Sequence, residues 1–409
     1  MSKEVFSILR QVRFLQGAAK ARLYKAFFLS SIMRVCFIQS TFHPFVGGTE
    51  RQSLQLAQRL RQRGVEVEVV TGRYKGLKPF ERVQGIPVHR VWLFDSGSKR
   101  SFLQTLSWSV SAFLHLMFSK PFDVYHAHQA LTPAFIASIV SKLRGKKSLS
   151  KIANTGKSGE MHTLNAGILG KILKPFVLCV GGFIATSTQA KRELLENGVS
   201  KIFEIPNGVD TETFKPVKNK LSLRKKLGLP LNKKLVLYLA KVEKQKAFPW
   251  LKFLLESWQN VKKKNAELVI LGQNRLSGLP NLSSVNFEGL KSNPQDYYQA
   301  CDVFVLPSSA EGLSNALLEA MSSALPVVAT KVSGTVDLVS HEKNGLLVPP
   351  NDLHALVTAL IRVLSKPSLS LGLQARRTIL GRFSFDHVVP KYMRLYRQLC
   401  VRDSSYGKE

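Results

Sequence analysis

Short apolar runs alternate with segments of helical periodicity along most of the chain. The run RVCFIQ at residues 34–39 is followed by a loop and by ERQSLQLAQRLRQRG, in which apolar residues recur every three or four positions. Apolar runs of strand length then follow in this order: VEVEVVTG, IPVHRVW, FDVYHAH, SKIANTG, GGFIATST and KIFEIPNG. Strands that alternate with helices are typical of parallel α/β architecture. The pattern predicts one doubly wound sheet over residues 33–205.

A turn-rich segment, PNGVDTETFKPVKNK at residues 206–220, interrupts this pattern. A second series of apolar runs comes after it, again with helical segments between them: KLVLYLA, AELVILG, SVNFEGL, CDVFVLP, LPVVAT and NGLLVPP. A chain of 409 residues is also longer than a single hydrophobic core usually supports. We therefore expect two Rossmann-like domains, at residues 33–205 and 206–385, and a C-terminal helix at 386–409.

The first 32 residues belong to neither series. They contain six basic residues and one acidic residue, and Val5, Ile8, Val12 and Leu15 recur near helical spacing. Three interpretations remain open: a basic amphipathic helix on a membrane, a targeting peptide, or residues upstream of a start at Met33. We favour a basic, interfacial or weakly packed N-terminal arm.

The net charge is the unusual feature of the composition. Lys and Arg total 59 against 27 Asp and Glu, which gives +32, and both halves of the chain are basic. A hydrophobic content of 44% excludes a largely disordered chain. The charge suits an anionic membrane surface, a nucleic acid or a polyanionic substrate, and charge alone does not choose among them.

Cysteine spacing and hydropathy restrict the location. No CxxC or metal-type spacing occurs, which predicts reduced, buried thiols in a cytosolic protein; the cysteines are Cys36, Cys179, Cys301 and Cys400. The longest apolar segment, LGKILKPFVLCVGGFIA, contains two lysines and a proline, so no stretch is predicted to span a membrane. We expect a cytoplasmic protein with peripheral contact at the inner face of the membrane.

The stretch SSAEGLSNALLEAM at residues 308–321 directly follows a predicted strand, and ligands of doubly wound sheets bind beyond the carboxyl ends of strands. A helix that starts at Ser314 or Asn315 places Glu311 ahead of it and Glu319 in its second turn. Eight residues of helix span about 12 Å, whereas the carboxylates of glycosidases stand roughly 5 to 9.5 Å apart. The two glutamates are therefore expected to hold opposite ends of one elongated ligand, with an anion at the helix start between them.

The segment PSSAEGLSNALLEAMSSALPVVAT resembles the signature of family 4 retaining glycosyltransferases of the GT-B fold, the glycosyl transferases group 1. The resemblance extends in motif order over roughly residues 33–400. It implies two domains that face each other across a cleft, with a nucleotide sugar held by the second domain and an acceptor by the first. It makes Glu311 a catalytic contact to the transferred sugar and Glu319 a contact to the ribose. The backbone of four further residues is expected to face the sugar and phosphates of the donor: Gly312, Leu313, Ser314 and Asn315.

The segment YLAKVEKQKAF at residues 238–248 resembles the family motif in which an Arg and a Lys clamp the donor diphosphate. Lys241 stands at the Arg position and Lys246, with a catalytic role, at the Lys position. This is a departure, because Lys offers a point charge where Arg offers a bidentate fork. Ala240 and Ala247 replace glycines that are usual in the motif.

The first domain matches the family at two places. In PFVGGTERQ, Gly48 is expected beside the donor phosphates, and Gly47 and Thr49 on the acceptor side. In DVYHAHQA, two histidines point to one face of a strand. The resemblance makes His128 a catalytic contact to the transferring sugar and places His126 on the acceptor side, with a core histidine as the alternative for either.

Two more segments match, and one pattern is missing. SGTVDLV places Gly334 near the donor, and FSFDHVVPKYMRLYRQL resembles the terminal helix that crosses back to the first domain. No Asp-x-Asp pattern occurs, so we expect no metal or other cofactor. Lysines and a helix start are then expected to stabilise the leaving group.

These features predict a retaining hexosyltransferase that uses a nucleoside diphosphate sugar. The basic first domain suggests a membrane-associated, lipid-linked or glycan acceptor in envelope or polysaccharide biosynthesis, and contact with an anionic membrane. Two alternatives remain: a nucleotide-sugar epimerase of the same fold, and a non-enzymatic nucleic-acid-binding protein. The second lacks a recognisable binding module in the sequence, so no nucleic-acid partner is expected.

Overall fold

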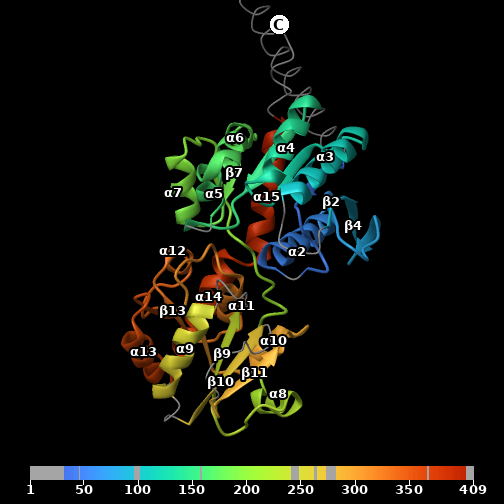
Figure 1. Cartoon of the computed structure of the whole chain (residues 1–409). Coiled ribbons are helices and arrows are strands. Elements are labelled where there is room, and N and C mark those ends of the chain that lie inside the picture. Colours follow the sequence, from blue (N-terminus) through green and yellow to red (C-terminus); the bar gives the residue numbers. More distant parts are fainter. Residues whose placement is uncertain are drawn as a thin grey trace, which may run out of the picture.

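A computed structural model of the chain describes residues 32–45, 47–95, 102–156, 159–240, 248–261, 265–272, 282–365 and 368–401. The expected N-terminal arm lies outside these residues, apart from Ile32. The chain forms two α/β domains that face each other (Figure 1). The expected fold class, GT-B with two doubly wound domains, is confirmed by this architecture and by the structural neighbours given below.

In the described part of the chain, the first sheet has eight strands in the order β3-β4-β2-β1-β5-β6-β7-β8. All neighbours pair in parallel except β3 and β4. The strand order changes direction between β1 and its neighbour β5, which creates a switch point there. The strands are β1 (Arg34–Ile38), β2 (Glu66–Arg73), β3 (Phe80–Val83), β4 (Ile86–Trp92), β5 (Val124–Ala127), β6 (Lys147–Lys151), β7 (Phe183–Ala185) and β8 (Ile202–Glu204).

The second sheet, over the same described residues, has six parallel strands in the order β11-β10-β9-β12-β13-β14. Its strands are β9 (Lys234–Ala240), β10 (Ala266–Gly272), β11 (Val285–Gly289), β12 (Val303–Leu306), β13 (Val327–Thr330) and β14 (Leu346–Val348). Most are continuous apolar runs, because a parallel sheet is covered on both faces. Every strand predicted for this half is present.

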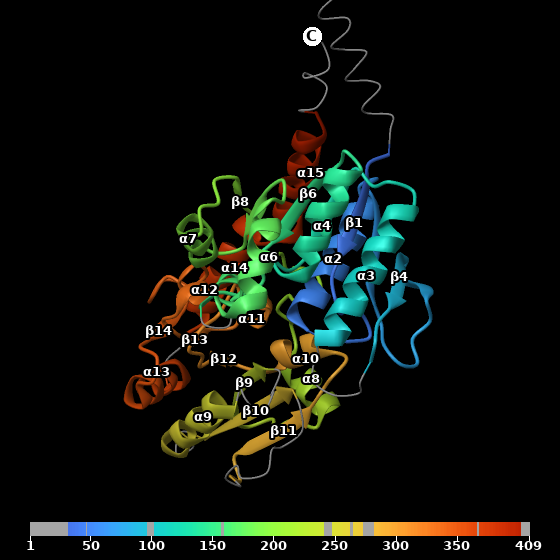
Figure 2. The same cartoon turned by 45° about the horizontal axis from the view of Figure 1, so that its top comes forward.

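Helices cover both faces of each sheet (Figure 2). Two hydrophobic cores lie on opposite faces of the first sheet. One contains side chains of α3 (Phe102–Phe118), α4 (Thr132–Leu143), α5 (Glu160–Asn165), α6 (Gly167–Leu178) and α7 (Thr188–Glu196), and the other contains side chains of α2 (Gly48–Gln62). On the second sheet, α8 (Lys220–Leu227), α10 (Pro294–Ala300), α11 (Asn315–Ser322) and α14 (Leu369–Arg382) share one core. The opposite core contains α9 (Phe248–Val261) and α13 (Leu353–Ser365), and the short α12 (Ser333–Val336) precedes β14.

The last helix, α15 (Phe385–Val401), leaves the second domain and packs beside α2 on the first sheet. Its buried side chains include Val389, Tyr392 and Tyr396, which share a core with Val35 and Phe37 of β1. The terminal helix therefore crosses back to the first domain, as the resemblance implies.

Two strands of the first sheet differ from the predicted pattern. β6 is KSLSK, whereas the apolar run predicted a strand at SKIANTG. The polar run forms a strand because Ser148 and Ser150 are buried, and the hydroxyl of Ser148 accepts a hydrogen bond from the backbone N–H of Gly181. β3, an edge strand paired antiparallel with β4, was not predicted.

The prediction of buried thiols holds for only part of the set. Cys36 and Cys301 are buried, Cys400 is half-buried and Cys179 is exposed, and no disulfide joins any of these four described residues. No single helix in the described ranges is long and apolar enough to cross a membrane; only α13 and α14 taken together reach that length and composition, and they meet at a bend of 103°.

Candidate active site

A cleft of about 830 Å³ lies between the two sheets. Loops at the carboxyl ends of β1, β5 and β6 form its first wall, and the ends of β9, β10, β11 and β12 form the second. This is the edge at which doubly wound sheets bind ligands. The second wall also carries Trp250 at the start of α9 and Leu290 after β11.

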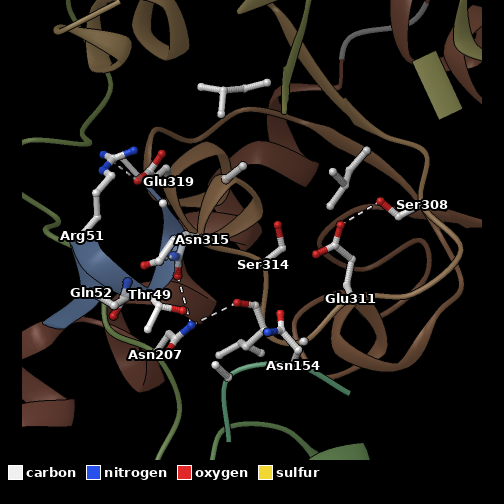
Figure 3. A pocket seen from close by; sticks show the side chains of 18 of the residues that line it. Thr49, Arg51, Gln52, Asn154, Asn207, Ser308, Glu311, Ser314, Asn315 and Glu319 are labelled. Carbon is white, nitrogen blue, oxygen red and sulfur yellow. Dashed lines mark hydrogen bonds and ion pairs between the residues drawn. The ribbon is translucent and has the colours of Figure 1, made fainter. Parts of the chain in front are cut away.

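The two predicted glutamates lie on opposite sides of the start of α11, with Ser314 between them (Figure 3). Ser314 is the N-cap of this helix, and its hydroxyl accepts from the backbone N–H of Leu317. Glu311 accepts a hydrogen bond of 2.7 Å from the hydroxyl of Ser308. Burial raises the pKa of Glu311, and the bond from Ser308 opposes this shift. The helix start that the sequence predicts is confirmed.

Glu319 is buried and is paired with a residue of the first domain. Nη2 of Arg51, on α2, lies 3.0 Å from Oε1 of Glu319 (Figure 3). Oε2 of Glu319 has no hydrogen-bond partner among the described residues. Burial raises the pKa of Glu319, and the charge of Arg51 acts against that rise.

Hydrogen bonds join the two walls at one end of the cleft (Figure 3). Nδ2 of Asn207 donates to the carbonyl of Leu313 and to Oδ1 of Asn315, at 3.1 and 3.0 Å. Nδ2 of Asn315 in turn donates to the carbonyl of Gly48, at 3.0 Å. Gly48, Thr49 and Asn315 thus meet at the cleft, and Gly47 lines it beside them.

Gly312 lies at a point where the two walls of the cleft touch. A Cβ at this position would stand 2.8 Å from the carbonyl oxygen of Ala153 in the first domain. The hydroxyl of Thr155 also donates to the carbonyl of Glu311, at 3.3 Å. The loop after β6 and the loop after β12 are therefore in direct contact.

Gly334, expected near the donor, is not among the residues that line the cleft. A Cβ there would overlap the carbonyl oxygen of Gly312, and the backbone N–H of Gly334 donates to the carbonyl of Glu311 at 3.1 Å. The structure places Gly334 behind the Glu311 loop, which it supports.

The two histidines differ in their surroundings. His128 borders the cleft, although its side chain is fully buried, and neither ring nitrogen has a hydrogen-bond partner among the described residues. His126 lies in the core beneath α15, and its Nδ1 is hydrogen-bonded to the hydroxyl of Tyr396 at 2.8 Å. Burial lowers the pKa of His126 to about 3 and that of His128 well below its usual value, so both rings are neutral at pH 7. Of this pair, the structure brings only His128 to the cleft.

The predicted diphosphate clamp lies outside the described residues. Lys241, Lys246 and Ala247 belong to 241–247, and only the backbone of Ala240 is described, as the last residue of β9. No cluster of His, Cys, Asp and Glu suited to a metal ion occurs in the ranges that the structure covers. The expectation that the enzyme needs no metal stays a prediction.

Several residues of the cleft were missed by sequence reasoning. Arg51, Lys151, Asn154 and Thr155 line it together with the predicted residues. The last three lie in SKIANTG, which the apolar pattern predicts to be a strand. Because β6 ends at Lys151, the rest of this segment forms a loop that lines the cleft. Arg51 lies inside PFVGGTERQ, the segment that resembles the family, and this position was the available signal.

Two family models match the chain. One, described as Glycosyltransferase Family 4, matches residues 46–213, and one, described as Glycosyl transferases group 1, matches residues 233–366. Over 390 residues the chain is 25% identical to the UDP-Gal:alpha-D-GlcNAc-diphosphoundecaprenol alpha-1,3-galactosyltransferase of Escherichia coli, covering 88% of this chain and 95% of that protein.

Solved structures share the fold. Sucrose-phosphate synthase from Thermosynechococcus elongatus has a TM-score of 0.75 at 22% identity, over 90% of this chain and 100% of that one. HepE from Anabaena, in complex with UDP-glucose, has a TM-score of 0.72 at 18% identity, with the same coverage of both chains.

Proposed function

Because the chain belongs to the group 1 glycosyltransferases of family 4 and has the GT-B fold, we propose that it is a retaining hexosyltransferase that uses a nucleoside diphosphate sugar. The observation that carries this proposal is the position of Glu311 and Glu319 on opposite sides of one helix start, inside a cleft between two doubly wound sheets. That arrangement suits a ligand with a sugar at one end, a ribose at the other and phosphates between them.

Each end of this ligand has a matching group. Glu311, whose pKa is raised by burial and whose carboxylate is held by Ser308, lies where it can accept a hydrogen bond from a sugar hydroxyl. Glu319, whose Oε2 is buried and has no hydrogen-bond partner among the described residues, is proposed to accept a ribose hydroxyl. Negative charge develops on the diphosphate as the glycosidic bond breaks, and the start of α11 favours such charge. Lys241 and Lys246 are proposed to complete this stabilisation.

For the acceptor we propose a lipid-linked or glycan substrate. The named acceptor of the Escherichia coli relative is a diphosphoundecaprenol-linked sugar, and its named donor is UDP-Gal. The first wall, formed by the loops after β1, β5 and β6, is the side from which such an acceptor would approach.

For the location we propose peripheral binding to an anionic membrane through α3 and α6. Two helices of the first domain's outer layer, which flank α4, carry exposed apolar residues at four-residue intervals: Phe102, Leu106, Val110, Leu114 and Phe118 on α3, and Ile168, Ile172 and Phe176 on α6. Figure 2 shows α3, α4 and α6 side by side. Apolar helix faces on a chain with a net charge of +32 suit a bilayer with anionic lipids.

A thermal-shift panel tests the central proposal. UDP, GDP, ADP and their sugars are added in turn, and at least one nucleotide family is expected to raise the unfolding temperature, because ligands that bind only the native state stabilise it. Incubation of the responding sugar nucleotide with candidate acceptors then identifies product. A panel in which no nucleotide shifts the transition contradicts the proposal.

A further inference from the structure

One charged side chain in the cleft has no counter-charge among the residues that the structure describes. Lys151, the last residue of β6, is 5% exposed and lines the first wall. Among the described residues, its ammonium group has neither an ion pair nor a hydrogen bond, and its Nζ lies 6.0 Å from the centroid of the Tyr392 ring. That distance is at the limit for a cation–π interaction.

The other buried cations in the described part of the chain are paired. Within the described ranges the buried Lys and Arg side chains are Arg90, Lys151 and Arg224. Arg90 lies 2.6 Å from a carboxylate oxygen of Glu81, and Arg224 lies 2.7 Å from one of Asp302. An unpaired buried charge is costly, and burial accordingly lowers the pKa of Lys151 to about 8. A purely structural role does not account for keeping such a group.

The position of Lys151 is that of a ligand contact. Ser150 pairs with Ala127, so Lys151 follows in register beside His128, close to the switch point between β1 and β5. The nearby carboxylates are engaged elsewhere. Glu160 accepts the backbone N–H groups of Ala153 and Asn154, at 3.2 and 3.0 Å, and Glu311 is held by Ser308. The neighbouring histidines are neutral at pH 7. No described group in this wall neutralises the positive charge of the Lys151 ammonium. The charge is therefore available to pair with an anionic group of a bound ligand.

We propose that Lys151 binds a phosphate group of the acceptor, so that the enzyme selects acceptors that carry a phosphate close to the hydroxyl that receives the sugar. This inference rests on the proposed function and deepens it. Lys151 lies on the wall formed by the first domain, whereas the donor phosphates are assigned to α11 and the clamp of the second domain. A lysine supplies the compact point charge that phosphate sites use.

The test uses Lys151→Met in the full chain, in buffer free of phosphate. Met keeps an unbranched chain and removes the charge. Without ligand, the variant is expected to unfold about 3 °C higher than the wild type, because an unpaired buried ammonium is removed. Lys142→Met, at an exposed lysine of α4, is the control and is expected to change neither stability nor binding.

Binding is measured in two steps by calorimetry. The nucleoside diphosphate that responds in the panel is titrated first, and Lys151→Met is expected to leave its affinity unchanged. Glucose 1-phosphate is then titrated onto the nucleotide complex. The variant is expected to bind it about 10- to 100-fold more weakly than the wild type, the range expected for a lost charge-assisted hydrogen bond.

Four results overturn the inference. Loss of stability in Lys151→Met assigns the lysine a structural role. An equal loss of nucleotide affinity assigns it to the donor. A wild-type nucleotide complex that does not bind glucose 1-phosphate, or that binds methyl α-glucoside equally well, removes the phosphate site. The first result is measured without ligand, and the other three require that the nucleotide binds. Failure of the proposed function is therefore seen separately, as the absence of any nucleotide shift.

Discussion

At the scale of single residues, Glu311 is the group on which turnover is predicted to depend most. Glu311→Ala is expected to lower kcat by about 100- to 1000-fold, the range found when one stabilising contact to a transition state is removed. Folding should be retained, because the backbone of this loop, rather than the carboxylate, makes the contacts to Thr155 and Gly334. Initial-rate measurements with the identified sugar nucleotide provide the check.

The matched control is Glu212→Ala. The side chain of Glu212 is 81% exposed, lies outside the cleft and is paired only with the exposed Lys215 among the described residues. The Glu212→Ala enzyme is expected to retain the wild-type rate. Unchanged turnover in Glu311→Ala would remove this glutamate from the mechanism.

Glu160 is predicted to make stability depend on pH. Burial, the largest influence, raises its pKa to about 7 from an ordinary value near 4.5. The folded state therefore holds a proton that the unfolded state releases between these values. This favourable contribution is fully present below pH 4.5 and is lost as the pH rises through 7, by about 3 kcal/mol in total.

Chemical denaturation at pH 5 and at pH 7.5 tests this sign. The wild type is expected to lose more stability between the two values than Glu160→Gln, which cannot ionise. The variant keeps a carbonyl oxygen that can accept the N–H groups of Ala153 or Asn154. Identical pH profiles for the two proteins would show that Glu160 is not the titrating group.

At the scale of elements, contact between the loops after β6 and β12 is predicted to limit catalysis. Gly312→Ala would place a Cβ 2.8 Å from the carbonyl oxygen of Ala153 and so push the walls apart. We expect kcat/KM to fall about 10- to 100-fold, because small displacements of positioned groups are costly in rate. The unfolding temperature should change little, since the collision is between domains.

Gly381→Ala, in α14, is the control for Gly312→Ala. A Cβ at Gly381 meets no atom within 4 Å, and alanine favours the helix. Steady-state kinetics should therefore match the wild type. A Gly312→Ala enzyme with wild-type kcat/KM would show that the close approach does not matter for turnover.

The elements themselves were largely predictable from the sequence, and the exceptions have physical reasons. Apolar runs located β9 to β14, and a serine with helix periodicity after it located the start of α11. β6 lies a few residues before its predicted position. Its polar side chains are buried, and Ser148 forms a hydrogen bond with the backbone of Gly181, a contact that no local sequence pattern encodes. Glu311 and Glu319 stand in one contiguous motif and could be proposed, whereas Arg51 and Lys151 acquire their positions only when β1, β6 and α11 come together.

At the scale of the whole molecule, the domains are joined by contacts on several elements. Arg59 of α2 pairs with Asp210 at 2.9 Å. Asp337, after α12, accepts the backbone N–H and the hydroxyl of Thr188 at 2.8 and 2.6 Å. The cleft is therefore bounded by polar contacts that can separate and re-form, as expected for an enzyme that closes over its donor.

The net charge and the exposed apolar helices together predict binding to membranes. The protein is expected to bind anionic liposomes, less strongly as salt increases, because screening weakens attraction to the surface. The double variant Val110→Glu and Leu114→Glu on α3 should bind severalfold more weakly, since it places acidic groups on the face proposed to enter the bilayer.

Co-sedimentation with liposomes measures both effects. Leu221→Glu, at an exposed leucine of α8 in the second domain, is expected to bind more nearly like the wild type. Equal binding to neutral and anionic liposomes would contradict the electrostatic part of this prediction. Unchanged binding of the α3 variant would contradict the assigned surface.

The return of α15 to the first sheet has a consequence for synthesis in the cell. Domains generally fold as they leave the ribosome, beginning with the N-terminal one. Here the face of the first sheet that contains Val35 and Phe37 is covered in part by Tyr392 and Tyr396. That face is left partly uncovered until the final helix has emerged, so the first domain to be translated is among the last parts to be completed. Nascent chains stalled before residue 385 should therefore present this apolar face to chaperones.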